Sequence, residues 1–239
     1  MYKYVFIVFL AVAGIVNARS QTAKISPVTV GKHSISNPVI NATFADPTVI
    51  AGRDGKYYAY ATQGVVNNKM MNIQVAVSVN LKDWKIIGDA LPVKPIWADT
   101  TQEFWAPHVV YDPKISKYVM FFSGESNDTS FGKYLGVAFS DKPAGPFTDM
   151  GEPLKTGKGF INIDPMAIIE PKTGRKLLYW GSGFQPIKVQ ELSDDWKSFK
   201  AGSKPNDLVW PGKDKTYSIL VEGAWVNYSH SYYYLFYSG

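Results

Sequence analysis

Four segments of the chain share one pattern, and their regular spacing limits the fold more than any other feature. The pattern is a short apolar stretch around an acidic or small residue, followed by a turn and then by a strand rich in aromatic residues. Successive copies lie 60, 58 and 58 positions apart, counted between Asp46, Ala106, Asp164 and Glu222. Repetition at a fixed period of this size is typical of proteins built from stacked or circularly arranged repeats.

Each repeat holds about four predicted strands. In the first repeat, the segment at Asp46 leads through the turn Asp54-Gly55 into an aromatic strand at 56–61, which predicts a hairpin. A third strand recurs at 73–78, 135–140 and 187–193. We expect a short polar outer strand after each of these, around Trp84, Phe147 and Trp196. Four antiparallel strands per repeat are typical of the blade of a β-propeller.

The fourth repeat reaches Gly239 directly after its second predicted strand. Common propellers need at least four blades to close a ring, so three and a half blades predict an open arc that stops before closure. An immunoglobulin-like sandwich is the competing all-β architecture, but its strands would not recur with the same internal order. Beyond the N-terminal segment no stretch shows sustained helical periodicity, which disfavours helical solenoids.

The N-terminal segment has the features of a secretory signal. Lys3 precedes an apolar run from Val5 to Val16, and small residues follow it up to Ala18. The run of about 12 residues is shorter than the roughly 20 that cross a bilayer, which disfavours a membrane anchor. We therefore expect a signal over 1–18, a lead-in over 19–36, an incomplete propeller domain over 37–239, and a secreted or periplasmic protein.

Composition excludes several classes of function. The chain has no cysteine, which removes disulfides and thiolate catalysis. The formal net charge is +5, but the lysines are scattered among acidic and aromatic residues rather than clustered as in nucleic-acid binding proteins. We expect no nucleic-acid partner, no membrane partner after signal cleavage, and a monomer; an acidic polysaccharide partner stays open.

Three of the four repeat starts carry a carboxylate, namely Asp46, Asp164 and Glu222. The first strand of each propeller blade lines the central axis, so these groups are expected around one mouth of the channel. Their apolar neighbours favour raised pKa values. Such a trio suits glycoside hydrolysis, in which one group activates water, one protonates the leaving oxygen, and one keeps that acid protonated. Strand capping or pairing with buried arginines is the structural alternative.

Together these motifs resemble glycoside hydrolase family 43, a family of five-bladed propellers acting on arabinan, arabinoxylan and xylan side chains. The likeness spans about residues 37–239 and rests on Ala45-Asp46-Pro47, Phe104-Trp105-Ala106-Pro107-His108, Ile163-Asp164-Pro165 and Val221-Glu222-Gly223. It implies that Asp46 is the general base, Glu222 the general acid, and Asp164 the residue that orients Glu222 and raises its pKa. It also implies inversion, which requires the Asp46 and Glu222 carboxyls to stand roughly 6.5–9.5 Å apart. A complete five-bladed ring would need roughly 60 to 90 further residues.

Aromatic residues beside the acids are candidates for a sugar platform, because a sugar face can stack on a ring. Trp105 is the predicted subsite wall, Phe44 a second contact, and His108 a group that bonds substrate or water. Three other aromatic residues are expected in the propeller core, namely Trp180, Phe184 and Trp225.

The histidines give little support for a metal site. His33 and His230 lie far from His108 in sequence, and cysteine is absent. We expect no metal ligand and no required cofactor. A structural calcium ion in the propeller channel stays an open option that no residue of this chain supports.

The leading hypothesis is an inverting hydrolase of plant polysaccharides that contain arabinose or xylose, with an α-L-arabinofuranosidase or arabinanase favoured over a β-xylosidase. A propeller that binds carbohydrate without cutting it is one alternative, disfavoured because buried acids are costly to keep. A fructan hydrolase is another, although that family usually has asparagine before the first Asp-Pro pair, where this chain has Ala45.

Overall fold

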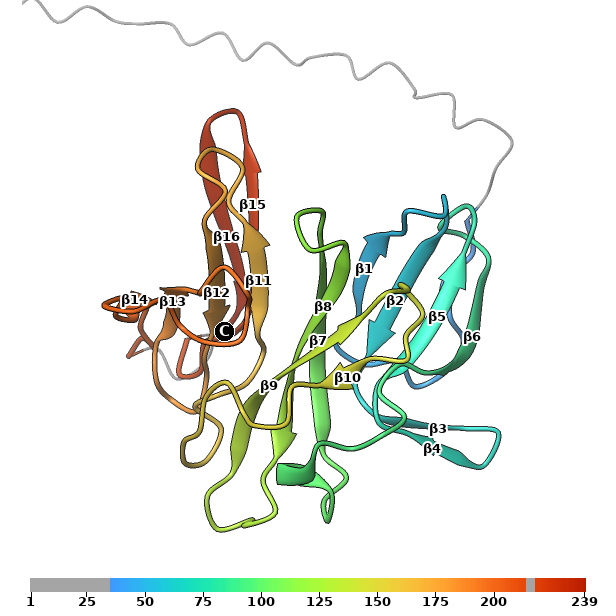
Figure 1. Cartoon of the computed structure of the whole chain (residues 1–239), viewed down its shortest axis with the longest axis horizontal. Coiled ribbons are helices and arrows are strands. Elements are labelled where there is room, and N and C mark those ends of the chain that lie inside the picture. The colour runs from blue at the N-terminus through green and yellow to red at the C-terminus, as the bar shows by residue number, and fades with distance from the viewer. Residues whose placement is uncertain (1–34, 214–217) are drawn as a thin grey trace, which may run out of the picture. The chain divides into compact units, whose positions relative to one another are not determined.

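The computed structural model describes residues 35–213 and 218–239 and is built from β-strands (Figure 1). Residues Ser36–Gly239 form one compact unit. Apart from the one-turn helix η1 (Ile96–Ala98), the described residues contain no helix, so nothing among them has the helical length and hydrophobicity for a bilayer crossing. The predicted signal at 1–18 and most of the predicted lead-in at 19–36 lie outside the described residues.

Three antiparallel sheets of four strands follow one another along the chain, as the repeats predict. The first contains β1 (Thr48–Ala51), β2 (Tyr57–Ala61), β5 (Gln74–Ser78) and β6 (Trp84–Asp89). The second contains β7 (Phe104–Asp112), β8 (Lys117–Glu125), β9 (Lys133–Ser140) and β10 (Thr148–Asp149). The third contains β11 (Met166–Ile169), β12 (Lys176–Trp180), β13 (Ile187–Glu191) and β14 (Asn206–Val209). The all-β, blade-like prediction is confirmed.

Two shorter sheets complete the described strands. The fourth repeat forms a hairpin of β15 (Glu222–Ser229) and β16 (Tyr232–Ser238). A small hairpin of β3 (Gly64–Val66) and β4 (Lys69–Met71) leaves the first sheet between β2 and β5. The four repeats succeed one another as an arc that does not close within the described residues (Figure 1).

Strand β8 shows why its sequence is almost continuously apolar. Side chains alternate between the two faces of a strand. Tyr118, Met120 and Phe122 pack into the core shared with the first sheet. Val119 and Phe121 pack into the core shared with the third sheet. Because neighbouring sheets cover both faces, both sets of side chains are buried.

The prediction of an outer strand around Trp196 is wrong. Trp84 does begin β6 and Phe147 immediately precedes β10, but the outer strand of the third sheet is β14. Trp196 lies in the preceding loop, fully buried, and its Nε1 donates a hydrogen bond to Asp112 Oδ2 at 2.8 Å. A large ring with a buried hydrogen-bond partner is more stable between two sheets than on an exposed edge.

Candidate active site

The starts of all four repeats meet around one cavity of about 200 Å³, the axial cavity. Each sheet contributes three consecutive residues to it. These are Asp46-Pro47-Thr48, Ala106-Pro107-His108, Asp164-Pro165-Met166 and Gly223-Ala224-Trp225. The repeat therefore brings segments that are far apart in sequence to a common centre.

Backbone angles show that the predicted equivalence of the four repeat-start residues fails by one position in the fourth repeat. Asp46, Ala106 and Asp164 have φ angles of 50°, 45° and 55°, and the residue with the matching angle of 64° is Gly223. Glu222 stands one position earlier. The expectation that Glu222 is equivalent to Asp46 and Asp164 is wrong, because counting between acids matched side chains instead of backbone conformation.

A second cavity, the carboxylate cavity, nevertheless unites the three acids. It has a volume of about 390 Å³ and contains Asp46, Asp164 and Glu222 together with aromatic, apolar and small residues. Those other lining residues are Trp105, Phe160, Ile163, Ser182, Gly183, Phe184 and Leu220. Trp105, Ile163 and Glu222 each directly precede the residue with positive φ, so one backbone position supplies this cavity from three sheets.

Hydroxyl groups at the ends of the second strands hold the repeat starts in place. Thr62, which follows β2, donates to Asp46 Oδ2 at 2.5 Å and accepts from the Ala106 backbone N–H at 2.9 Å. Ser123 of β8 accepts from the Asp164 backbone N–H at 3.2 Å. The sequence reasoning missed these residues, although Thr62, Ser123 and Ser182 recur at 61 and 59 positions, which is the repeat period.

Glu222 and Asp164 are joined through the same arrangement. Buried Ser182 donates to Glu222 Oε2 at 2.7 Å. The backbone N–H of Gly223 donates to Asp164 Oδ2 at 2.9 Å. Each of the three hydroxyls thus contacts the start of the following repeat, and the three acids are anchored by different blades.

The electrostatics of Asp164 agree with a shared carboxylate site. Burial raises the pKa of Asp164 to about 7, with further contributions from the charges of Glu222 and Asp46 against the hydrogen bond from Gly223. Near neutral pH the Asp164 carboxyl is therefore partly protonated, beside two other acids.

His108 lies in the axial cavity and does not line the carboxylate cavity. It is buried, and burial lowers the pKa of its imidazole to about 4. Its Nδ1 accepts a hydrogen bond from the Ala167 backbone N–H at 3.2 Å, so the single ring proton of neutral His108 is on Nε2. The ring meets Trp225 edge-on with centroids 5.4 Å apart. His108 is therefore neutral, lines the axial cavity, and has its N–H donor on Nε2.

The structure distributes the predicted aromatic residues differently from expectation. Trp105 lines the carboxylate cavity and Trp180 is in the core, 1% exposed, whereas Phe44 lines neither of these two cavities. The core predictions for Phe184 and Trp225 are wrong, because these rings are 64% and 41% exposed and line the carboxylate and axial cavities.

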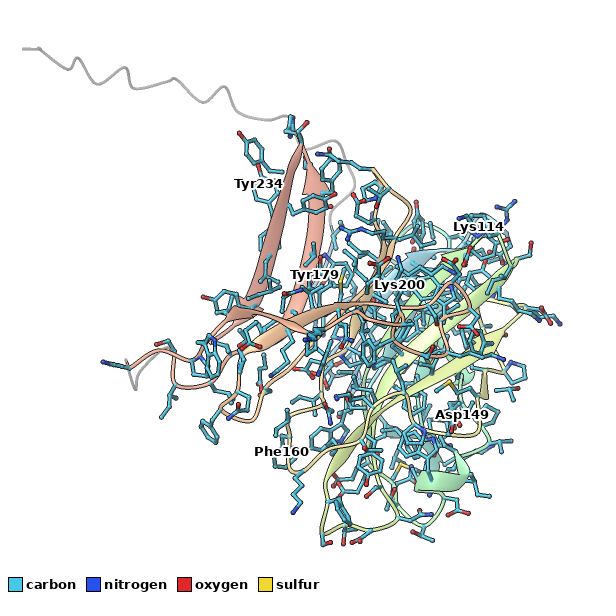
Figure 2. The ribbon with its side chains drawn as sticks, turned by 60° about the vertical axis from the view of Figure 1, so that its left-hand side comes forward. Lys114, Asp149, Phe160, Tyr179, Lys200 and Tyr234 are labelled. Carbon is cyan, nitrogen blue, oxygen red and sulfur yellow. The ribbon has the colours of Figure 1, made fainter. Side chains whose placement is uncertain are left out.

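Phe160 was missed altogether. It lies on a loop outside the sheets (Figure 2) and stacks parallel to Trp105, with centroids 6.0 Å apart and an interplanar angle of 3°. Across 35–213 and 218–239, no group of three or more His, Cys, Asp or Glu side chains is arranged to hold a metal ion.

Comparison with known proteins identifies relatives of the whole arrangement. The model of glycosyl hydrolases family 43 matches residues 35–239. A xylosidase/arabinosidase of Bacteroides ovatus is 26% identical over 214 residues, which cover 76% of this chain and 58% of that protein. A probable arabinan endo-1,5-alpha-L-arabinosidase A of Aspergillus flavus is 28% identical over 198 residues, which cover 81% of this chain and 57% of that protein.

The fold has the same relatives. The crystal structure of an endo-1,4-beta-xylanase from Bacteroides thetaiotaomicron superposes with a TM-score of 0.67 and 29% identity, covering 82% of this chain and 63% of that one. The chain thus spans less than two thirds of the length of each of these relatives.

Proposed function

Because the chain belongs to glycosyl hydrolase family 43, we propose that it hydrolyses glycosidic bonds in polysaccharides that contain arabinose or xylose. The observation that carries this proposal is the carboxylate cavity, in which Asp46, Asp164 and Glu222 from three different sheets face one space of about 390 Å³. A cavity that combines acids with aromatic rings suits a sugar, whose apolar face stacks while its hydroxyls bond to polar groups.

In the proposed reaction, Asp46 is the general base that deprotonates water and Glu222 is the general acid that protonates the leaving oxygen. Thr62 and Ser182 hold one oxygen of each carboxyl, at 2.5 and 2.7 Å, and so orient the other toward the cavity. Asp164, whose own pKa is raised to about 7, is partly protonated near neutral pH and accepts a hydrogen bond from the backbone N–H of Gly223, the residue after Glu222. Water attacks the anomeric carbon as the leaving oxygen departs, in one displacement with inversion.

For the linkage, we propose that arabinosides are cleaved in preference to xylosides. The names of the relatives support this choice only in part, since both arabinosidase and xylosidase occur among them. The loops that carry Phe160 and Phe184 would decide the preference, because these exposed rings line the carboxylate cavity and would contact the sugar.

The test is to incubate the purified protein with arabinan, arabinoxylan, xylan and aryl pentosides, beside Asp46→Asn and Glu222→Gln. We expect pentose release by the wild type and a fall in kcat of roughly a hundredfold to ten-thousandfold in each variant, because each loses a proton-transfer group. Asp141→Asn is the matched control, since this carboxylate pairs with Lys117 on the surface.

Three outcomes contradict the proposal. Turnover that survives in both variants excludes the assigned roles. Oligosaccharide binding without any release indicates a carbohydrate-binding propeller, and release of fructose from fructan indicates a different glycosidase. The anomer released first, followed by proton NMR, distinguishes inversion from retention.

A further inference from the structure

Lys133 carries a fully buried ammonium group next to Trp105, a lining residue of the carboxylate cavity. It is the first residue of β9, and its side chain is 0% exposed. Its Nζ lies 2.5 Å from Glu103 Oε2 and 2.8 Å from Glu125 Oε2. Burying a charge is unfavourable unless the charge is paired, and here the two glutamates offset the cost of burying the ammonium. A lysine kept without solvent access is therefore a candidate for a specific structural role.

The same ammonium lies over the indole of Trp105. Its Nζ is 3.7 Å from the ring centroid, well within the range of a cation–π interaction, which is strongest when the cation is desolvated. Glu103 precedes β7 by one residue, and Glu125 pairs with Lys133 across β8 and β9. The ammonium is therefore held above the ring by Glu125 of β8 and by Glu103 just before β7, a placement suited to limit the tilt of the indole.

The backbone of the same segment positions the second ring. The Lys133 N–H donates to Gly159 O at 2.9 Å, and the Gly159 N–H donates to Phe131 O at 2.6 Å. The contact is close, since a Cβ on Gly132 would meet Gly159 O at 2.4 Å. The next residue, Phe160, then stacks on Trp105. We call Trp105 and Phe160 the aromatic wall; residues 131–133 position both of its rings.

We propose that Lys133 is a positioning residue of the carbohydrate site, which fixes the aromatic wall so that a pentose unit finds its platform already ordered. The inference rests on the proposed function and names a residue that does not itself touch substrate. A preordered platform strengthens binding, because less side-chain freedom is lost when the sugar arrives. Losing Lys133 should therefore weaken binding more than it slows the chemical step.

The experiment compares Lys133→Met with Lys133→Arg and measures KM and kcat on the best pentoside. We expect Lys133→Met to raise KM about tenfold while kcat falls less than about threefold, and Lys133→Arg to recover most of the loss because it keeps the charge. Lys117→Met is the matched control, because Lys117 forms a 2.6 Å ion pair with Asp141 at the surface, and it should behave as wild type.

A second variant guards against misfolding. Lys133→Met leaves Glu103 and Glu125 facing each other, so Lys133→Met combined with Glu125→Gln lowers the repulsion and should show the same rise in KM. An unchanged KM in the folded variants, or a fall in kcat alone, would overturn the inference.

A fluorescence measurement separates this inference from the proposed function. The emission of Trp105 is obtained as the difference between each protein and its Trp105→Phe counterpart, and its quenching by acrylamide is measured without ligand. We expect Lys133→Met to make Trp105 more accessible to acrylamide, whether or not any pentoside is cleaved. If acrylamide quenches wild type and variant equally, Lys133 does not position Trp105. If quenching differs but no pentoside is cleaved, only the proposed reaction is rejected.

Discussion

At the scale of single residues, the site depends on a backbone conformation that side chains ordinarily avoid. Asp46, Ala106 and Asp164 have φ between 45° and 55°, and such left-handed residues outside glycine cost roughly 1–3 kcal/mol each. Hydrogen bonds from the strand ends offset the cost, since Thr62 contacts Asp46 and Ala106 and Ser123 contacts Asp164. At this left-handed position the chain changes direction, so that Trp105 lines the carboxylate cavity and the following Ala106 lines the axial cavity.

The first residue-scale prediction concerns Asp164. Asp164→Asn should lower kcat and remove the change of activity near pH 7, because an amide that does not titrate replaces the carboxyl whose pKa is raised to about 7. The pH–rate profile measures this. Asp149→Asn is the control: burial raises the pKa of Asp149 to about 6, but the residue lines neither the axial nor the carboxylate cavity. A profile for Asp164→Asn that superposes on wild type would contradict this role of Asp164.

At the scale of strands and sheets, neighbouring blades are joined by buried polar groups as well as by apolar cores. Lys176 Nζ lies 2.6 Å from Asp112 Oδ2, which also accepts from Trp196 Nε1 at 2.8 Å. Burial opposes ionisation of Asp112, but the hydrogen bonds from Lys176 and Trp196 outweigh it and lower the pKa of the carboxyl. The pair joins the end of β7 to the start of β12.

Lys176→Met should therefore destabilise the protein by about 3–5 kcal/mol, because it leaves the Asp112 carboxylate buried without its cation. Lys176→Met combined with Asp112→Asn should recover part of this loss, as the uncompensated charge is then gone. Lys117→Met, at an exposed pair, should cost less than about 1 kcal/mol. Denaturant unfolding measures all three. A Lys176→Met protein as stable as wild type would show that the pair does not hold the two sheets together.

At the scale of the whole molecule, burial differs between the middle and the last sheet of the arc. Strand β8 has a sheet on each face, whereas β16 exposes most of its aromatic side chains, and Tyr234 stands near the end of the β15–β16 hairpin (Figure 2). Two titratable groups with shifted pKa values, Asp164 and His108, line the axial cavity at the centre. Their protons therefore couple the stability of the whole unit to pH.

Two central groups should act on stability with opposite signs between about pH 4 and pH 7. The pKa of Asp164 is raised from 3.8 to about 7, so the folded state holds the extra proton and stability falls as pH rises. The pKa of His108 is lowered from 6.5 to about 4, so the unfolded state holds the extra proton and stability rises with pH. Each group contributes at most about 1.4 kcal/mol per pH unit.

Removing either group should leave only the pH dependence of stability that the other group causes. Asp164→Asn should make the free energy of unfolding rise more with pH over this range than in wild type, and His108→Gln should make it fall more. Urea unfolding at several pH values measures these slopes, with His230→Gln at an exposed position as the control. Parallel curves for wild type and both variants would mean that neither group changes its protonation on folding.

The sequence by itself determined the blades and drew attention to the three carboxylates that share one cavity. The repeat spacing, the aromatic second strands and the carboxylates at Asp46, Asp164 and Glu222 are properties of local segments, and comparing the chain with itself reveals them. Burial on both faces of β8 also follows from its composition, since a strand so apolar is stable only between two sheets.

Only the tertiary structure decided which atoms meet. Gly223, not Glu222, has the backbone conformation of the other repeat starts. Trp196 lies outside the outer strand and donates to the buried Asp112 carboxylate. The ammonium of Lys133 lies over the indole of Trp105. Each of these depends on backbone angles or on partners from other strands, which spacing along the chain does not encode. A period in sequence specifies that segments are alike; the packing of unlike side chains between them specifies the site.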